Sequence, residues 1–346
     1  MSEIDPIYAE LASRIQGADE KYIPRILSRL ANIEQAKILK ALPDKDRDPA
    51  AGASLSISDT FVENLGMDKE IVDKHIRELF EKGVLFPTRK GPQMARNWMQ
   101  LHDSTLPNPK YDESLGNEFF DLWGEADRKP KRPIETKFDP DASDFRIIPK
   151  WKSIKNIPGV LPQEDMRQIL KSQELMVIIP CGCKRSFRER ECGTPDESCI
   201  TVGRAAQYNL DSGLGRKITY EEALEILEKF DQYPVLNLTI NQGDVNTLIC
   251  NCHWCCCNAV KGAAKTRFIA YEDAEKCQTC NICVERCQYD AIQIKYDPEL
   301  DKERSYTDPE LCRGCGDCVI SCPHEARGMK AIRPPDHIPE SVKIYS

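Results

Sequence analysis

Short helical patterns fill most of the first hundred residues, and a strand pattern follows them. Apolar side chains recur at helical spacing and then meet stop signals, which are Pro43, Gly66 and Gly83 for the three patterns in turn. The expected elements are a helix over residues 22–42, a short helix over 58–65, a helix over 67–82, a strand over 84–86 and a turn over 89–91.

This succession of helices, strand and basic turn resembles a winged helix over about residues 22–100. A winged helix that reads DNA presents a basic stripe to the phosphates. The third helix is neutral instead, because it balances Lys69, Lys74, Arg77 and Lys82 against Glu70, Asp73, Glu78 and Glu81. We therefore expect residues 1–105 to dock on a protein rather than to bind DNA.

A proline-rich stretch follows over residues 106–162. Its prolines are spread through polar sequence, which is typical of an extended chain, and they are Pro107, Pro109, Pro130, Pro133, Pro140, Pro149, Pro158 and Pro162. We expect an extended strap that is anchored by two apolar patches, Phe119–Phe120 and Leu122–Trp123.

Residues 163–262 have the pattern of a small α/β module. β-Prone apolar stretches at 175–179, 235–240 and 247–249 predict strands. Ahead of the second stretch, Thr219 and Glu222 form a capping box that opens an apolar helix.

Cysteine is distributed very unevenly along the chain. All 17 cysteines lie between Cys181 and Cys322, in a chain of 346 residues with a net charge of −8. No apolar run approaches the roughly 20 residues that span a bilayer, and the acidic N-terminus has no apolar block of the signal-peptide kind. We therefore expect a cytoplasmic protein whose cysteines bind metal rather than form disulfides.

Eight of the cysteines form two runs with the same spacing, C-x2-C-x2-C-x3-C. They are Cys277, Cys280, Cys283 and Cys287 in the first run, and Cys312, Cys315, Cys318 and Cys322 in the second, 35 positions later. Three thiolates two residues apart can surround one face of an iron–sulfur cubane, whereas structural zinc usually pairs two C-x2-C units over a longer spacer. The doubled spacing therefore favours iron–sulfur clusters over zinc.

Residues 266–333 resemble a two-cluster bacterial ferredoxin, and residues 263–346 are the expected domain. The resemblance implies two [4Fe-4S] clusters with crossed ligands: Cys277, Cys280, Cys283 and Cys322 for the first, and Cys312, Cys315, Cys318 and Cys287 for the second. Gln288 departs from the family, because proline usually follows the fourth cysteine, and the segment 288–311 is long and charged. Neither departure removes a ligand.

The remaining nine cysteines fall into two groups, each directly after a strand pattern. They are Cys181, Cys183, Cys192 and Cys199, and then Cys250, Cys252, Cys255, Cys256 and Cys257. Three uses stay open: one or two further [4Fe-4S] clusters, a structural zinc ion, or a redox-active thiol pair within 255–257. The company of two ferredoxin-type clusters favours the first use, with His253 supporting the site rather than binding metal.

The whole layout is similar to multi-cluster iron–sulfur proteins of anaerobes, in which a cysteine-rich module precedes a two-cluster ferredoxin domain. No G-x-G-x-x-G motif after a strand, no G-x4-G-K-[ST] and no G-x-S-x-G is found, so the chain offers no recognisable nucleotide site and no catalytic residue. The expected fold is a multidomain α+β protein with a winged-helix-like domain, a cysteine-rich α/β module and a C-terminal ferredoxin-like domain.

The function expected from these patterns is low-potential electron relay to or from a larger oxidoreductase or another redox partner in anaerobic metabolism. This makes the chain a component of an oxidoreductase complex rather than a stand-alone enzyme. Two alternatives are a redox-sensing winged-helix transcription regulator, and a reductase that applies an additional cluster or the Cys255–Cys257 thiols directly to a substrate.

Overall fold

The computed structural model describes residues 4–15, 21–43, 54–128, 143–188 and 193–340 of a mixed α+β protein. The chain divides into two units. Unit 1 comprises residues 1–131, 180–189 and 209–215, and unit 2 comprises residues 132–179, 190–208 and 216–346.

Unit 1 is mainly helical. Its elements are α1 (Pro6–Ser13), α2 (Ile23–Leu30), α3 (Ile33–Ala41), α4 (Asp59–Leu65), α5 (Lys69–Glu81), β1 (Leu85–Thr88), β2 (Gly91–Met94), α6 (Trp98–Thr105), α7 (Tyr111–Ser114), α8 (Gly116–Arg128) and α11 (Gly182–Ser186). The expected helices over 58–65 and 67–82 and the strand after them are confirmed as α4, α5 and β1. The winged-helix resemblance of this region stays a prediction.

The prediction of one helix over residues 22–42 is wrong in one respect, because this segment forms two helices, α2 and α3. Asn32 adopts an extended conformation between them and accepts a hydrogen bond from the Gln35 backbone, while the Gln35 side chain bonds the Asn32 backbone in return. This capping box begins α3 inside one continuous apolar periodicity. Asparagine at a helix N-cap therefore outweighs the hydrophobic pattern at this point.

The extended strap expected over residues 106–162 is also wrong for its first part. Residues 111–114 and 116–128 form α7 and α8, and the apolar patches lie on α8 as Phe119, Phe120 and Trp123, all buried. These side chains lie at helical spacing, and no proline separates them. Residues 129–142 fall outside the described residues.

An ion pair lies inside unit 1. The Nε2 atom of His102 lies 3.0 Å from Asp127 Oδ2, and the two side chains are 3% and 2% exposed. Burial alone lowers the pKa of His102, but the carboxylates of Asp127 and Asp103 outweigh it and raise the pKa to about 10. His102 is therefore protonated near neutral pH.

The raised pKa of His102 makes unit 1 less stable in alkali. Because the folded pKa lies above the ordinary value of 6.5, the stabilisation is complete below about pH 6.5 and is lost as the pH rises toward 10. We expect the unfolding temperature to fall over this range, and to fall less in a His102→Gln variant. Equal slopes in thermal denaturation from pH 7 to 10 would contradict this assignment.

Unit 2 contains a six-stranded sheet in the order β3-β7-β8-β5-β4-β6. Its strands are β3 (Phe145–Ile148), β4 (Met176–Pro180), β5 (Glu197–Val202), β6 (Arg216–Lys217), β7 (Leu236–Ile240) and β8 (Leu248–Cys252). The helices are α9 (Trp151–Ile154), η2 (Pro162–Glu164), α10 (Met166–Lys171), α12 (Gly203–Asp211), α13 (Tyr220–Phe230) and α14 (Asn258–Gly262). Ile169 of α10 and Leu227 of α13 share a buried core with Ile178 and Ile200 of the sheet. The expected capping box at Thr219 is confirmed.

Part of the second cysteine group lies inside the sheet rather than after a strand. We expected loops after 175–179 and 247–249, and Cys181 does follow β4, but Cys250 and Cys252 lie within β8. Hydrogen bonds between polar side chains extend β8 beyond its apolar stretch. The Asn237 side chain on β7 donates to Asn251 on β8 at 2.6 Å, and Asn251 donates to the Ser198 carbonyl at 3.0 Å.

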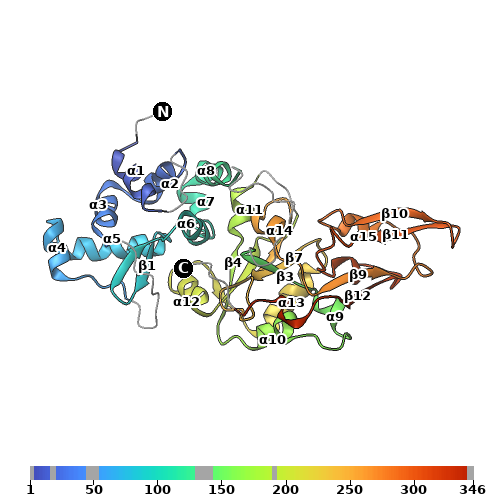
Figure 1. Cartoon of the computed structure of the whole chain (residues 1–346). Coiled ribbons are helices and arrows are strands. Elements are labelled where there is room, and N and C mark those ends of the chain that lie inside the picture. The colour runs from blue at the N-terminus through green and yellow to red at the C-terminus, as the bar shows by residue number, and fades with distance from the viewer. Residues whose placement is uncertain (1–3, 16–20, 44–53, 129–142, 189–192, 341–346) are drawn as a thin grey trace. The chain divides into compact units, whose positions relative to one another are not determined.

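The ferredoxin-like part of unit 2 is built from two halves. Its elements are β9 (Phe268–Glu272), α15 (Ile282–Arg286), β10 (Ile292–Asp297), β11 (Lys302–Thr307), α16 (Asp317–Ile320), β12 (Arg327–Ala331) and the 3-10 helix η3 (Pro335–His337). β9 pairs with β12 and β10 pairs with β11, both antiparallel (Figure 1). A shift of 35 positions carries β9 onto β11 and β10 onto β12. Each two-stranded sheet therefore takes one strand from each half.

The backbone repeats with the same shift. Thr279 and Asn281 have φ of 54° and 63°, and Gly314 and Gly316, 35 positions on, have φ of 72° and 79°. Both cysteine runs therefore pass through the left-handed region at the same two places. The second run needs glycine there, because a Cβ on Gly314 would lie 2.1 Å from Thr266 Oγ1 and 2.2 Å from the Phe268 carbonyl oxygen.

A Gly314→Ala substitution should therefore destabilise unit 2 by roughly 2 kcal/mol or more, through overpacking and backbone strain. Gly159→Ala is the matched control, since Gly159 has φ of 76° and nothing within 4 Å of an added Cβ. Thermal denaturation followed by circular dichroism should give a clearly lower unfolding temperature for Gly314→Ala than for Gly159→Ala. Equal unfolding temperatures would show that the close approach of Gly314 to Thr266 and Phe268 is unimportant for stability.

Candidate iron–sulfur sites

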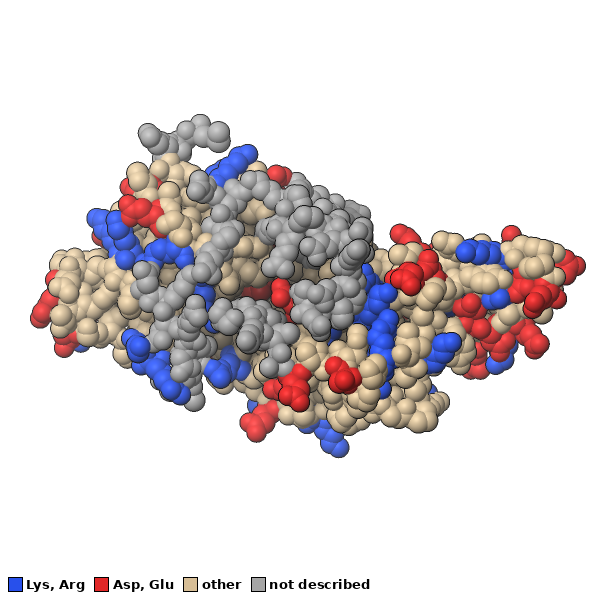
Figure 2. Space-filling model, in the orientation of Figure 1, with Lys and Arg blue, Asp and Glu red and all other residues tan. Residues whose placement is uncertain are grey.

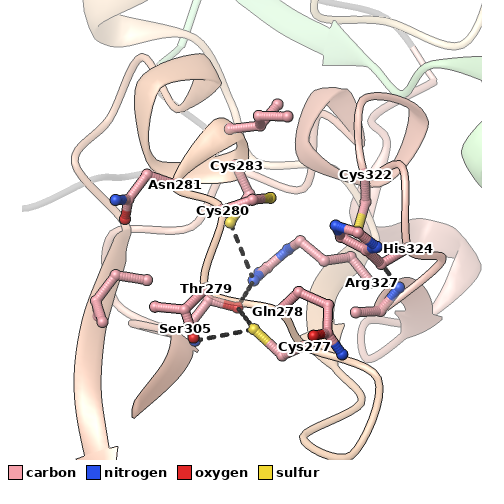
Figure 3. Close-up of a pocket in the computed structure, with 13 residues that line it drawn as sticks. Cys277, Gln278, Thr279, Cys280, Asn281, Cys283, Ser305, Cys322, His324 and Arg327 are labelled. Atoms are coloured by element: carbon pink, nitrogen blue, oxygen red, sulfur yellow. Dashed lines mark hydrogen bonds between the residues drawn. The ribbon is translucent and has the colours of Figure 1, made fainter.

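The first thiol site is a cavity between the first cysteine run and the end of the second (Figure 3). Its lining includes Cys277, Cys280, Cys283 and Cys322, together with Gln278, Thr279, Asn281, Ile282, Ile294, Ser305, His324, Ala326 and Arg327. Cys322 joins three thiols of the other run, and Cys287 does not line this cavity. This is the arrangement that the ferredoxin resemblance implies.

Hydrogen-bond donors point at the sulfurs of the first site. The backbone N–H of Ser305 lies 3.5 Å from Cys277 Sγ, the N–H of Ala326 lies 3.3 Å from Cys322 Sγ, and Arg327 Nη1 lies 4.0 Å from Cys283 Sγ. Burial raises the pKa of Cys277, but the N–H groups of Ser305 and Thr279 outweigh it, so that the pKa is lowered. These donors favour the thiolate of Cys277, whereas burial raises the pKa of Cys283. Thiolates are the ligands of an iron–sulfur cluster.

The second thiol site gathers Cys312, Cys315, Cys318 and Cys287. Burial raises the pKa of Cys287, and the neighbouring Cys312 adds to this rise. Burial also raises the pKa of Cys318 to about 12, and both Cys312 and Cys287 add to it. The pKa of Cys315 is raised by burial and by Asp317, Cys318 and Cys287. Cys287 also packs against the buried cluster that contains Cys312 and Cys318, so the fourth cysteine of the first run lies beside the second run.

An ion pair fastens the helices that carry the two sites. Arg286 of α15 lies 2.8 and 2.9 Å from the carboxylate oxygens of Asp317 on α16, and it also donates to the carbonyls of Asp231 and Gln232. The Asp317 side chain is 2% exposed. A bidentate pair of this kind fixes orientation as well as distance.

A third group of thiols lies in the cysteine-rich module. Cys199 on β5 and Cys250 on β8 are direct cross-strand partners, with their sulfurs 3.8 Å apart. Hydrogen bonds with Cys250 and Cys257, followed by burial, raise the pKa of Cys252 well above its ordinary value. We call Cys199, Cys250, Cys252 and Cys257 the module thiols.

The other cysteines of the two groups are not all brought to this place. Cys181 and Cys183 belong to unit 1, where the N–H of Lys184 lies 3.4 Å from Cys181 Sγ, and Cys192 falls outside the described residues. His253 Nδ1 lies 2.9 Å from Cys255 Sγ, and Cys256 donates to the His253 carbonyl at 3.8 Å. Within the described ranges, no three His, Cys, Asp or Glu side chains meet in a way that could hold a single metal ion.

Three neighbours of the thiol sites were missed by sequence reasoning. Ser305 and Arg327 border the first site, and Tyr289 packs in the same buried cluster as Cys315, Cys252 and Cys257. The internal repeat offered a signal for two of them. Arg327 corresponds to Ile292, and Ser305 to Ala270, so polar groups stand in one half where the other has apolar ones.

Comparison with known families agrees with this geometry. Residues 276–326 match the family model of the 4Fe-4S dicluster domain. The C-terminal part of this chain contains a 4Fe-4S dicluster domain. The match supports [4Fe-4S] cluster binding and indicates iron–sulfur electron transfer. No curated protein and no solved structure matches the chain. No helix among the described residues is long and apolar enough to cross a membrane.

The four thiols of the first site fit a [4Fe-4S] cluster by their softness and by the donors around them. Double variants test which cysteines share a cluster. Cys280→Ala with Cys322→Ala removes two ligands of one cluster under crossed ligation, so about four irons should be lost, whereas Cys280→Ala with Cys287→Ala should cost about eight.

Iron and acid-labile sulfide per chain, measured on anaerobically purified protein and compared with the wild type, check this difference. Cys280→Ala alone is the control and should lose as much iron as the first pair. The reverse order of the two pairs would show that each run binds its own cluster.

Proposed function

We propose that this chain is an electron-transfer protein or subunit that passes single electrons between a redox partner at the dicluster domain and a larger oxidoreductase. One observation carries the proposal. Cys315 of the second thiol site packs in the same buried cluster as Cys250, Cys252 and Cys257 of the module. A [4Fe-4S] cluster exchanges one electron at a time, and its protein surroundings set the potential.

The first site supplies a port to the surface. Cys280 is exposed, whereas Cys277 and Cys283 are buried. The Thr279 hydroxyl donates to the Glu303 carbonyl at 2.8 Å, so the β10–β11 hairpin lies beside this run. Exposed carboxylates gather over that hairpin (Figure 2), and they include Glu299, Asp301 and Glu303. Charge complementarity favours a redox partner with a basic docking surface.

The path continues from the first site to the second. Cys283 of α15 and Cys318 of α16 belong to one buried cluster with Cys312, and Met329 packs among them. The Arg286–Asp317 ion pair holds the two helices in this arrangement. Two clusters held by these thiols would be direct neighbours, with no solvent layer between their ligands.

The path then reaches the cysteine-rich module through Gln288 and Tyr289. The Gln288 side chain accepts from the Trp254 N–H and donates to the Pro234 carbonyl, and the Tyr289 hydroxyl donates to the Val260 carbonyl at 2.8 Å. The residue that departs from the ferredoxin pattern therefore joins the dicluster domain to the module. We infer that the module thiols hold a third centre, most simply a further iron–sulfur cluster.

The remaining parts have docking roles in this proposal. The helices of unit 1 would bind a larger oxidoreductase subunit, and an anaerobic cytoplasm suits clusters that oxygen damages. DNA binding has no support, because Lys69, Lys74 and Arg77 on α5 are balanced by acids on the same helix.

Metal content tests the third centre. Anaerobically purified wild type should contain clearly more than about eight irons, with matching sulfide and less than one zinc. Cys252→Ala should lose about four irons while the reduced dicluster domain keeps its electron paramagnetic resonance spectrum. Ser198→Ala, next to Cys199 on β5, controls for local repacking.

Two outcomes would overturn parts of this proposal. About eight irons with one zinc that is lost in Cys252→Ala would make the module structural, and the path would end at the second site. Absence of iron in the wild type after anaerobic reconstitution would remove the electron-transfer function as a whole.

A further inference from the structure

The two halves of the dicluster domain differ at one buried position. A shift of 35 positions places Arg327 where the first half has Ile292, and both residues begin a strand after the fourth cysteine of a run. Ile292 is apolar and buried, whereas Arg327 brings a positive charge to the equivalent place. The internal repeat thus provides its own apolar reference for this arginine.

Arg327 is enclosed rather than solvated. Its side chain is 1% exposed, and its Nη1 donates to Ser305 Oγ at 2.9 Å and lies 4.0 Å from Cys283 Sγ (Figure 3). Its Nη2 donates to the Thr307 hydroxyl. The guanidinium therefore lies at a sulfur of the first thiol site.

One donor of this guanidinium has no partner. Arg327 Nε is fully buried and donates no hydrogen bond within the described residues. A buried donor without a partner costs free energy comparable to a lost hydrogen bond. A cluster held by the adjacent thiols would bring sulfur atoms that can accept a hydrogen bond from Arg327 Nε.

The nearest carboxylate does not cancel the charge. Glu272, the cross-strand partner of Arg327, lies 3.8 Å from Nη2 but also 3.5 Å from Arg304 Nη1. Arg304 also pairs with Asp297, and Glu272 meets Arg327 only at Nη2. The Nη1 atom faces Ser305 and Cys283 Sγ instead, in a low-dielectric setting where charge interactions are strong.

Resting on the proposed cluster binding, we propose that Arg327 sets the reduction potential of the cluster at the first thiol site, as a buried cation that favours the reduced state of that cluster. Reduction adds one electron, taken from the donor protein, and hence one negative charge to a cluster. The guanidinium stays protonated throughout, so no proton moves. Arg327 acts through its positive charge, which it holds beside the thiols, and it need not bind iron.

Potentiometric titration followed by electron paramagnetic resonance tests this role. Arg327→Ile copies the other half of the repeat, and it should lower the reduced-to-oxidised ratio at a fixed solution potential about tenfold, which is about 59 mV for one electron. Arg327→Lys keeps the charge and should shift the ratio less. The matched control is Lys295→Met, which removes the same formal charge from an exposed place on β10, where solvent and salt screen it.

Iron content separates the possible results. Arg327→Ile with wild-type iron and an unchanged titration overturns the role of Arg327 while leaving the electron-transfer function intact. An equal shift in Lys295→Met also overturns it, because any cation in the domain would then suffice. If Arg327→Ile fails to hold iron, Arg327→Gln and Arg327→Lys are compared, and equal potentials in these two overturn the role of the charge.

Discussion

Crossed strand pairing is the constraint on which the rest of the dicluster domain depends. β9 pairs with β12 and β10 with β11, so neither half of the repeat completes a sheet alone. The same crossing joins the loops: the Asp273 N–H donates to the Ala326 carbonyl at 2.8 Å, and the Asp308 N–H to the Ala291 carbonyl at 2.7 Å. Because each half ends beside the other half's beginning, its last cysteine arrives at the other half's three thiols.

The sequence predicted what depends on local spacing. The cysteine runs, the capping box at Thr219 and the limits of α4 and α5 follow from residues close together in the chain. The break at Asn32 was hidden, because one apolar periodicity runs through both α2 and α3. The helix α8 was missed for a related reason: prolines on either side outweighed the helical spacing of Phe119, Phe120 and Trp123 in the prediction.

What depends on strand order could not be predicted. Cys199 and Cys250 are neighbours only because β5 and β8 pair in the sheet, although 50 residues lie between them in the chain. Arg327 looks like an ordinary surface arginine in a strand until the packing of α15 and β11 against β12 encloses it. Pairwise contacts of this kind arise from the tertiary fold, and periodicity carries no signal for them.

The crossing also has a consequence for the order of events during synthesis. A chain that has emerged from the ribosome only through the first cysteine run presents three thiols for one site and one for the other, and neither set is complete. Under crossed ligation the second site becomes complete at Cys318 and the first at Cys322, only four residues later. Cluster insertion would therefore begin late, and both clusters could be built on a nearly finished domain within one episode of iron delivery.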